Sequence, residues 1–433
     1  MGAPHRHRVP TPSNAARRLA RYLPRVVASG DETGIAREFA RTGCAPGRLD
    51  PASGEGQWLW VRVDHVPKET AGRLAQAFLA VGGDAAMGAP HAEGPPAETT
   101  MLLAASAGQY RRMLEEVTRL PGEVGEVGRA VQAALAHRAA RPARLLRGAH
   151  RPIPLGEHTR VMGVVNVTPD SFSDGGQHMD PERAVAWALK LAREGADLLD
   201  IGAESTRPGA SEVSVEEEWR RLEPVLTSLH TKTPVPLSVD TRHAEVARRA
   251  LEAGADLVND VSGLRDPEMR RLIARTGAPA VVAHMRGVPE TMQRDTRYAD
   301  VTGEVYAALA QAVALAVEEG VSAEGLLIDP GLGFGKSAEQ NLELLARLSE
   351  FRSLGYPVLI GASRKSFLSR ALGGVPPSER LEAGLAAAVI AARAGASYVR
   401  THDVGPTVRA LRLADAVERA GFEPEPSEPR SPG

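Results

Sequence analysis

Between residues 160 and 402, short apolar runs repeatedly end in polar or charged side chains. VMGVVN ends at Asn166, PLSVD ends at Asp240, and LLIDP carries Asp329 at its end. Five further runs end at Glu204 to Arg207, Asn259 and Asp260, His284 and Met285, Ser363 to Lys365, and Arg400 to His402. Any one of these residues could be a helix cap or a turn residue. Their repetition after every apolar run instead indicates one shared ligand-binding surface.

The residue types at these ends suit a flat nitrogen heterocycle with an anionic arm. Carboxylates and a primary amide accept paired N–H donors from a ring edge, and the chain offers Asp240, Asn259 and Asp329. Lys365 can donate to a ring carbonyl or nitrogen. Cationic groups suited to phosphate are present at Arg207, Arg400 and His402. The oxygen of Asn166 would suit Mg²⁺ that is shared with phosphate oxygens.

The elements that must position these groups alternate between strand-like runs and helical patterns. Four tetrads with a central glycine, at 194–197, 253–256, 276–279 and 394–397, each follow a helical pattern and precede an apolar run. Glycine is typical just after a helix, where φ is positive. Eight strand–helix units over about 270 residues predict a (β/α)₈ barrel, with a doubly wound open sheet as the alternative. In such a barrel the carboxyl ends of the strands hold the site.

The glycine-rich segment DPGLGFGKS (329–337) is not a Walker A phosphate loop. Gly331 stands four residues before Gly335, whereas in that motif the first glycine stands five residues before the glycine of the Gly-Lys pair. We interpret it as a turn that brings backbone close to a flat ligand, with Phe334 covering the ligand.

The motifs NVTPDSFSDGG, ESTRPG, SVDT, NDVSG, HMRG, DPGLGFGK, GASRKS and RTHDV occur in an order and spacing that resemble dihydropteroate synthases. The resemblance covers roughly residues 155–418. It implies a (β/α)₈ enzyme, usually a homodimer, that uses Mg²⁺ in folate biosynthesis. The implied reaction joins 6-hydroxymethyl-7,8-dihydropterin diphosphate to 4-aminobenzoate, giving 7,8-dihydropteroate and diphosphate. Sulfonamides, which mimic 4-aminobenzoate, are implied inhibitors.

The resemblance also implies a role for individual residues. Asn166 would be the Mg²⁺ ligand, and the pterin-binding set would be Asp240, Asn259, Asp329 and Lys365. The pterin slot would be walled by Met285, Phe334 and Gly361. Contacts to the diphosphate would come from Thr206 and from Arg400, Thr401 and His402, with Ser363 on the same rim. The aminobenzoate site would use Phe172, Arg207, Pro208 and Ser366. Catalytic roles fall to Asp240, Lys365, Arg400 and His402.

Two features of the matched motifs bear on activity. The polar loop after Asn166, which runs to Gly176, is expected to move and to close over bound pterin and diphosphate. Thr401 stands where the family usually has valine, between Arg400 and His402, and we expect activity to survive this difference.

Two alternative functions remain open from the sequence. A corrinoid methyltransferase that uses methyltetrahydrofolate has a similar pterin-binding barrel, but it has no need of the polar loop or of the Ser-Arg-Lys and Arg-x-His groups. A non-catalytic pterin-binding regulatory protein would show decay in the diphosphate-binding residues, and none is seen.

The remaining sequence predicts three regions. Residues 1–148 read as a small α/β domain of unknown role, 149–422 as the barrel, and 423–433 as a disordered Pro-rich tail, with a basic, Pro-rich linker over 140–156. The N-terminal region has 20 Lys plus Arg against 14 Asp plus Glu within residues 1–150, but no nucleic-acid-binding motif. Lacking a catalytic constellation, it is interpreted as an interaction or assembly module. The single Cys44 and the absence of a long apolar run favour a cytoplasmic protein with small-molecule substrates and neither membrane nor nucleic-acid partners.

Overall fold

The computed structural model describes residues 58–88, 98–140, 145–156, 158–167, 180–205 and 213–422. These residues form two compact units, which divide between Arg129 and Ala130. The division lies inside one helix, closer to the N-terminus than the expected boundary after residue 148. Cys44 and the expected disordered tail lie outside the described residues.

The N-terminal unit is a three-stranded antiparallel sheet with helices. Its elements are β1 (Trp58–Pro67), α3 (Lys68–Ala80), β2 (Asp84–Met87), β3 (Glu98–Ser106), α4 (Ala107–Val117) and the start of α5 (Glu123–Ala139). β3 is central, in the order β1-β3-β2. Phe78 of α3 and Tyr110 of α4 pack edge to face in its core, with ring centroids 5.0 Å apart. The expected small α/β fold is therefore confirmed.

The second unit contains eight parallel strands in the order β11-β10-β9-β8-β7-β6-β13-β12. They are β6 (Arg160–Asn166), β7 (Leu198–Gly202), β8 (Leu237–Asp240), β9 (Leu257–Asp260), β10 (Ala280–Ala283), β11 (Leu326–Asp329), β12 (Leu359–Ile360) and β13 (Tyr398–Thr401). A parallel bridge between Ile328 and Val358 joins the two outer strands and closes the sheet. The predicted (β/α)₈ barrel is confirmed, and the open-sheet alternative is wrong.

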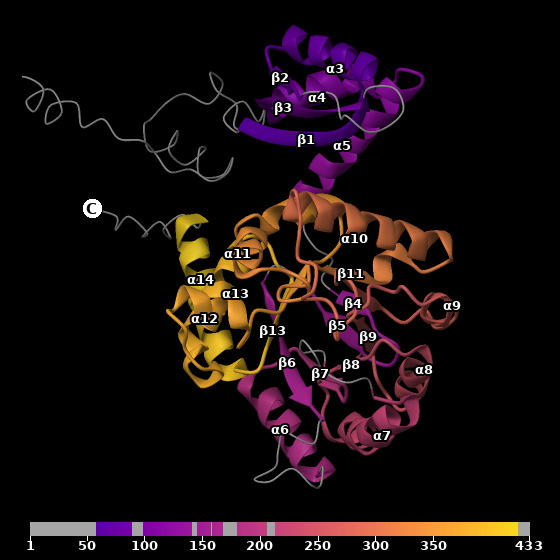
Figure 1. Cartoon of the computed structure of the whole chain (residues 1–433), viewed down its shortest axis with the longest axis vertical. Helices are drawn as coiled ribbons and strands as arrows, with labels where there is room; N and C mark the ends of the chain where they lie inside the picture. Colours follow the sequence, from indigo (N-terminus) through magenta and orange to yellow (C-terminus); the bar gives the residue numbers. More distant parts are fainter. Residues whose placement is uncertain are drawn as a thin grey trace, which may run out of the picture. The chain divides into compact units, whose positions relative to one another are not determined.

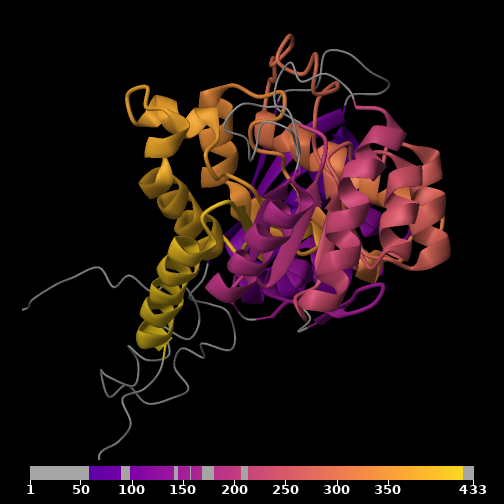
Figure 2. The same cartoon turned by 90° about the horizontal axis from the view of Figure 1, so that it is seen from below.

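Helices cover the outside of this sheet, as Figures 1 and 2 show. They are α6 (Pro181–Glu194), α7 (Val215–Lys232), α8 (Ala244–Glu252), α9 (Pro267–Thr276), α10 (Val301–Glu318), α11 (Ala338–Ala346), α12 (Ser366–Ala371), α13 (Leu381–Arg393) and α14 (Val404–Phe422). Asp180 caps α6 by accepting a hydrogen bond from the Glu182 amide. All four glycines of the sequence tetrads have positive φ, between 66° and 110°: Gly195, Gly254, Gly277 and Gly395. Each therefore ends a helix and turns the chain into the next strand, as predicted.

Side chains inside the barrel form layers because successive strand residues point to opposite faces. One apolar layer lies near the amino ends of the strands and includes Met162, Leu198, Leu257, Val281, Leu327, Leu359 and Tyr398. The residue two positions later on each strand points inward again, one layer nearer the carboxyl ends. Four of these positions carry polar side chains: Asp200, Asn259, Asp329 and Arg400. A polar layer therefore lies directly above an apolar one.

A β-hairpin closes the amino end of the barrel. It consists of β4 (Leu145–Arg147) and β5 (Pro152–Pro154), and Leu146 and Ile153 join the interior apolar layer. Burying each of these side chains stabilises the fold by roughly 1.5–3 kcal/mol. The predicted linker is therefore wrong for these residues. Apolar and polar residues alternate in this Pro-rich segment, so it forms two short strands whose apolar side chains close the end of the barrel. Ligands must enter from the opposite end.

Among the described residues, only α10 has the length and composition of a membrane-spanning helix, with a mean hydropathy of 1.2. It packs against β10 and α11 in the barrel wall. Its composition alone therefore carries no membrane assignment.

Candidate active site

Asp200 lies at the centre of the polar layer and is fully buried. Its carboxylate accepts hydrogen bonds from Arg400 Nε at 2.6 Å, from the Ser238 hydroxyl at 2.6 Å and from Asn259 Nδ2 at 3.1 Å. Arg400 also donates from Nη2 to Asp240 at 2.7 Å. Asp200 thus links side chains from four strands.

Asp200 was missed in the sequence because it stands inside the run LLDIG rather than at its end. One signal could have found it: it follows Leu198 by two residues, just as Asn259 follows Leu257 and Asp329 follows Leu327. This spacing marks the inward-facing position of each strand. A charged residue at that position of a buried strand requires partners inside the barrel.

Asp240 ends β8, and its side chain is largely buried between Arg400 and other carboxylates. Burial raises the pKa of Asp240 to about 7, an effect that the charge of Arg400 opposes. A carboxylate that needs Arg400 to stay ionised can exchange this partner for N–H donors of a ligand. The structure therefore brings Asp240, Asn259 and Arg400 together.

A second group forms where the turns after β11 and β12 meet. Asp329 accepts a hydrogen bond from the Gly331 amide at 2.7 Å, and burial raises its pKa. Lys365 donates from Nζ to the Leu332 carbonyl and lies 4.5 Å from the centre of the Phe334 ring. Burial lowers the pKa of Lys365 to about 8. Asp329 and Lys365 thus offer an acceptor and a donor near the Phe334 ring.

Two glycines allow this close packing. Gly333 has φ of 83°, and a Cβ placed there would lie 3.1 Å from Lys365 Cδ. A Cβ on Gly361 would lie 3.7 Å from Arg400 Cβ and 3.8 Å from Lys365 Nζ. A larger residue at Gly361 would fill the space between the Arg400 and Lys365 side chains, and one at Gly333 would press on the Lys365 side chain.

The second lysine in a glycine-rich motif, Lys336, has a different role. It is buried and donates to the carbonyls of Gly331 and Phe334 at 2.8 and 3.0 Å. Its Nζ lies 2.9 Å from His284 Nδ1, and burial lowers the pKa of His284 to about 2, so this imidazole is neutral and accepts. Lys336 and His284 therefore hold the turn after β11 in shape.

His402 and Ser363 meet at the end of β13. The Ser363 hydroxyl accepts from the His402 amide at 3.2 Å and lies 3.1 Å from His402 Nδ1. Next to them, Arg364 has φ of 60° and pairs with Asp403 at 2.6 Å. The loops after β12 and β13 are thereby joined, with the half-buried His402 between them.

The side chain of Thr401 faces the opposite way. It is buried, its hydroxyl accepts from the Asp403 amide at 3.1 Å, and it lies 3.3 Å from the Thr407 hydroxyl of α14. Tyr398 and Arg400 point into the barrel, so Thr401 must point outward. The structure does not bring the Thr401 side chain together with the other site residues.

The other predicted residues lie as follows. Met285 is buried just after β10, Ser366 is exposed as the first residue of α12, and Asn166 is partly buried at the carboxyl end of β6. Asn166 pairs with Gly202, and Gly202 pairs with Asp240, so these strand ends are neighbours. Phe172, Thr206, Arg207 and Pro208 lie outside the described residues, as does the polar loop from 168 to 179.

Comparison with known proteins places this geometry among related barrels. A family model described as pterin binding enzyme matches residues 162–402. Dihydropteroate synthase of Escherichia coli K12 is 47% identical over 259 residues, which cover 60% of this chain and 92% of that protein. The solved structure of Xanthomonas albilineans dihydropteroate synthase with 4-aminobenzoic acid is 48% identical, with a TM-score of 0.61. The matched region covers 64% of this chain and 98% of the Xanthomonas albilineans chain.

One relative matches a longer part of the chain. A probable bifunctional folylpolyglutamate synthase/dihydropteroate synthase of Halobacterium salinarum is 44% identical over 354 residues, covering 81% of this chain and 42% of that protein. A match of this length exceeds the residues from 149 onward, so it extends into the N-terminal region.

Proposed function

The chain belongs to the family of pterin-binding enzymes, and from this premise we propose how its barrel carries out the dihydropteroate synthase reaction. The enzyme condenses 6-hydroxymethyl-7,8-dihydropterin diphosphate with 4-aminobenzoate, giving 7,8-dihydropteroate and diphosphate in folate biosynthesis. One observation carries the assignment of residues. Acceptors and a donor converge at one end of the barrel, in the polar layer and the turns above it: Asp240, Asn259, Asp329 and Lys365.

The pterin ring binds in the polar layer. The carboxylates of Asp240 and Asp329 accept hydrogen bonds from the N–H groups of the ring. The Asn259 side-chain amide forms a further hydrogen bond with the ring, and Lys365 donates to a ring acceptor. Phe334 and Met285 contact the faces of the ring, and Gly361 leaves room for it. Because burial raises the pKa values of both aspartates, the paired donors of the ligand stabilise their ionised forms.

Arg400 must change partners when the pterin binds. In the structure it bonds to both Asp200 and Asp240. The N–H groups of the pterin replace Arg400 as the donors to Asp240. Arg400 Nε keeps its hydrogen bond to Asp200, so the side chain stays in place while its Nη groups turn toward the diphosphate. His402, fixed by Ser363, donates to the same anion. Thr206, which lies outside the described residues, is the third proposed contact.

The chemical step breaks the bond between the pterin methylene carbon and the diphosphate oxygen. Positive charge develops on the pterin-methyl group, and the buried carboxylate of Asp240 stabilises it. Arg400 and His402 stabilise the negative charge of the leaving diphosphate. The amine of 4-aminobenzoate then attacks the methylene carbon to form the C–N bond, and the amine proton passes to solvent. No covalent bond to the protein forms.

Mg²⁺ fits the donor chemistry beside Asn166. This residue offers a neutral oxygen at the carboxyl end of β6, where substrate phosphate and water would supply the remaining oxygens. When bound, the ion would neutralise charge on the diphosphate. Asn166 is the residue of this chain that would hold it.

The aminobenzoate site forms around the exposed start of α12. Ser366 lies there, and Arg207, Pro208 and Phe172 are proposed to complete the site from segments outside the described residues. The polar loop after Asn166 is proposed to close over both substrates, which would exclude water from the cationic intermediate.

The assembly and location of the enzyme are part of the same proposal. It acts as a homodimer in a reducing cytoplasm, in keeping with a single cysteine in 433 residues. The N-terminal unit serves interaction or assembly, since the described part of it has no buried polar cluster like that of the barrel. Light scattering on the full chain would test the dimer: a mass near 46 kDa, that of one chain, would contradict it.

The direct test is release of diphosphate from the pterin substrate with Mg²⁺, with and without 4-aminobenzoate. Release coupled to formation of dihydropteroate is expected, and omission of Mg²⁺ should abolish it. Binding of pterin without turnover would contradict the catalytic assignment and favour a regulatory pterin-binding protein.

A further inference from the structure

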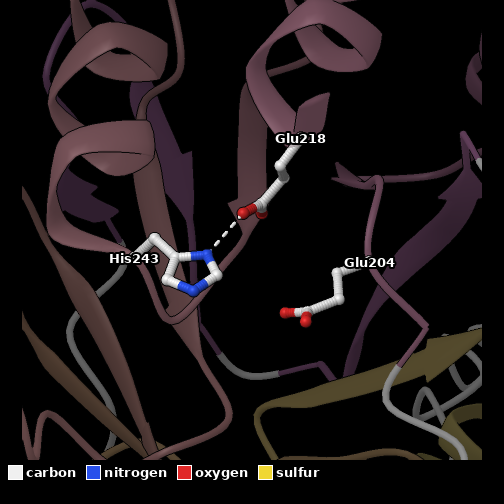
Figure 3. Close-up of side chains that lie close together, drawn as sticks. All are labelled: Glu204, Glu218 and His243. Atoms are coloured by element: carbon white, nitrogen blue, oxygen red, sulfur yellow. Dashed lines mark hydrogen bonds and ion pairs between the residues drawn. The ribbon is translucent and has the colours of Figure 1, made fainter. Parts of the chain in front are cut away.

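A cluster of three potential metal ligands lies beside the polar layer, outside the residues used above. Glu204 follows β7, Glu218 lies in the first turn of α7, and His243 precedes α8. Potential ligand atoms of the three side chains lie within 4.8 Å of one another. Figure 3 shows the Glu218 carboxylate bonded to the His243 ring and the Glu204 carboxylate facing the same ring.

Glu218 is the unusual member of this cluster. Its side chain is fully buried, and Oε2 lies 2.7 Å from His243 Nδ1. Oε1 has no hydrogen-bond partner among the described residues. Buried carboxylate oxygens are normally paired or bound to a metal, because an unpaired one loses its water without replacement. The second oxygen therefore indicates a ligand that is not part of the described chain.

We propose that Glu204, Glu218 and His243 form a binding site for a divalent transition-metal ion, with Zn²⁺ as its best-matched probe. One imidazole and two carboxylates are a ligand set that zinc accepts, with water in the fourth position. Ligand atoms around zinc stand roughly 3.4 Å apart at bond lengths of about 2.1 Å. Rotation of the side chains must therefore shorten the longest separation, which is at most 4.8 Å, by up to about 1.4 Å. Mg²⁺ is a poorer match because it avoids imidazole.

Arg242 is the main opposing charge. It pairs with Glu204 at 3.0 Å, and Glu204 also accepts from the Val213 amide at 3.2 Å. A carboxylate oxygen has two lone pairs, so Glu204 can keep Arg242 and still face an ion. The alternative is two closed ion pairs, Glu204 with Arg242 and Glu218 with His243. That arrangement leaves Glu218 Oε1 without a partner.

An ion at this site would tie β7 to the starts of α7 and α8. Glu204 lies two residues before Thr206, so the ion would fix one end of the segment that carries Thr206 and Arg207. The site is distinct from Asn166 and does not depend on the proposed reaction.

Calorimetric titration of the full, chelator-treated chain with Zn²⁺ tests the proposal. Glu218→Gln and His243→Gln should each remove one binding site or weaken it at least 100-fold. The matched control is His158→Gln: His158 also pairs with a carboxylate, Asp415 at 3.4 Å, but it is 45% exposed and has no third ligand. This control should bind Zn²⁺ as the wild type does. Mg²⁺ should not compete.

Two further measurements keep the test decisive if a buried variant fails to fold. Glu204→Gln changes a residue at the edge of the cluster and should weaken Zn²⁺ at least tenfold. X-ray absorption of the wild-type zinc complex should show a mixed shell of nitrogen and oxygen at about 2.0–2.2 Å. Equal zinc stoichiometry and affinity in the wild type and all three variants, or a shell of several imidazoles, would overturn the proposal in favour of closed ion pairs.

Discussion

Replacing Asp200 by asparagine tests whether this buried carboxylate organises the active site. The change keeps the shape of the side chain but removes the charge that holds Arg400 at 2.6 Å. Removing one partner of a buried ion pair costs roughly 3–5 kcal/mol. Arg400 retains Asp240 at 2.7 Å and is 22% exposed, so we expect a loss at or below the lower end, about 2–3 kcal/mol of unfolding free energy.

This loss has two measurable consequences. At roughly 2–4 °C per kcal/mol for a domain of this size, the melting temperature should fall by about 4–12 °C. Asparagine keeps only one acceptor oxygen, so one of the hydrogen bonds that position Arg400 and Asn259 is lost. One misplaced hydrogen bond weakens ligand binding by roughly 1.5 kcal/mol. The KM for the pterin diphosphate should therefore rise about tenfold.

Asp256 provides a matched control because it is also fully buried and paired with an arginine, but at the amino end of β9. It accepts from Arg151 Nε at 2.9 Å and from the Arg151 and Leu237 amides at 2.6 and 2.8 Å. Asp256→Asn should destabilise the fold at least as much, while KM stays unchanged. Both variants are assayed at 20 °C below their own melting temperatures, with the ellipticity of each checked first. A KM that rises equally in both variants, or in neither, would refute the role given to Asp200.

Three other predictions follow from the site. As the pH rises toward 7, Asp240 with its raised pKa ionises, so the affinity for the pterin diphosphate should increase by up to about tenfold per pH unit. As the pH rises above about 8, Lys365 with its lowered pKa loses its proton, so the affinity should decrease. Asp240→Asn should abolish the acidic limb of this profile, and an unchanged limb would assign it to another group. Thr401→Val should leave kcat/KM within roughly threefold of the wild type and cost about 1 kcal/mol of unfolding free energy, since the Thr401 hydroxyl faces α14. A large loss of kcat/KM at unchanged stability would show instead that Thr401 contacts the substrate. A chain beginning at Gly122 should keep kcat within about twofold of the full chain, because it retains the β4–β5 hairpin that closes the amino end of the barrel. A large loss of kcat with an intact fold would show that the N-terminal unit takes part in catalysis.

Local features of the sequence were enough to predict the barrel and to place candidate site residues at the ends of its strands. Glycine after each helix, apolar runs of strand length and polar residues at their ends are encoded within a few residues, so they need no knowledge of distant contacts. The parallel topology then brings the carboxyl ends of all strands to one end of the barrel. Asp240, Asp329 and Lys365 could therefore be placed on one rim from the sequence alone.

The tertiary structure decided which of these groups contact one another and what each does. Asp200 holds Arg400 across the barrel over 200 positions of sequence, a contact that no local pattern encodes. Two lysines in similar glycine-rich motifs differ in their surroundings: Lys336 is enclosed by backbone carbonyls, whereas Lys365 lies over the Phe334 ring. Thr401 points outward because the adjacent Arg400 points into the barrel. The segment expected to be a linker forms a hairpin whose Leu146 and Ile153 cover the apolar interior of the barrel. In each case the deciding factor is what surrounds the side chain after folding, since burial and partners, rather than residue type, set its charge and its role.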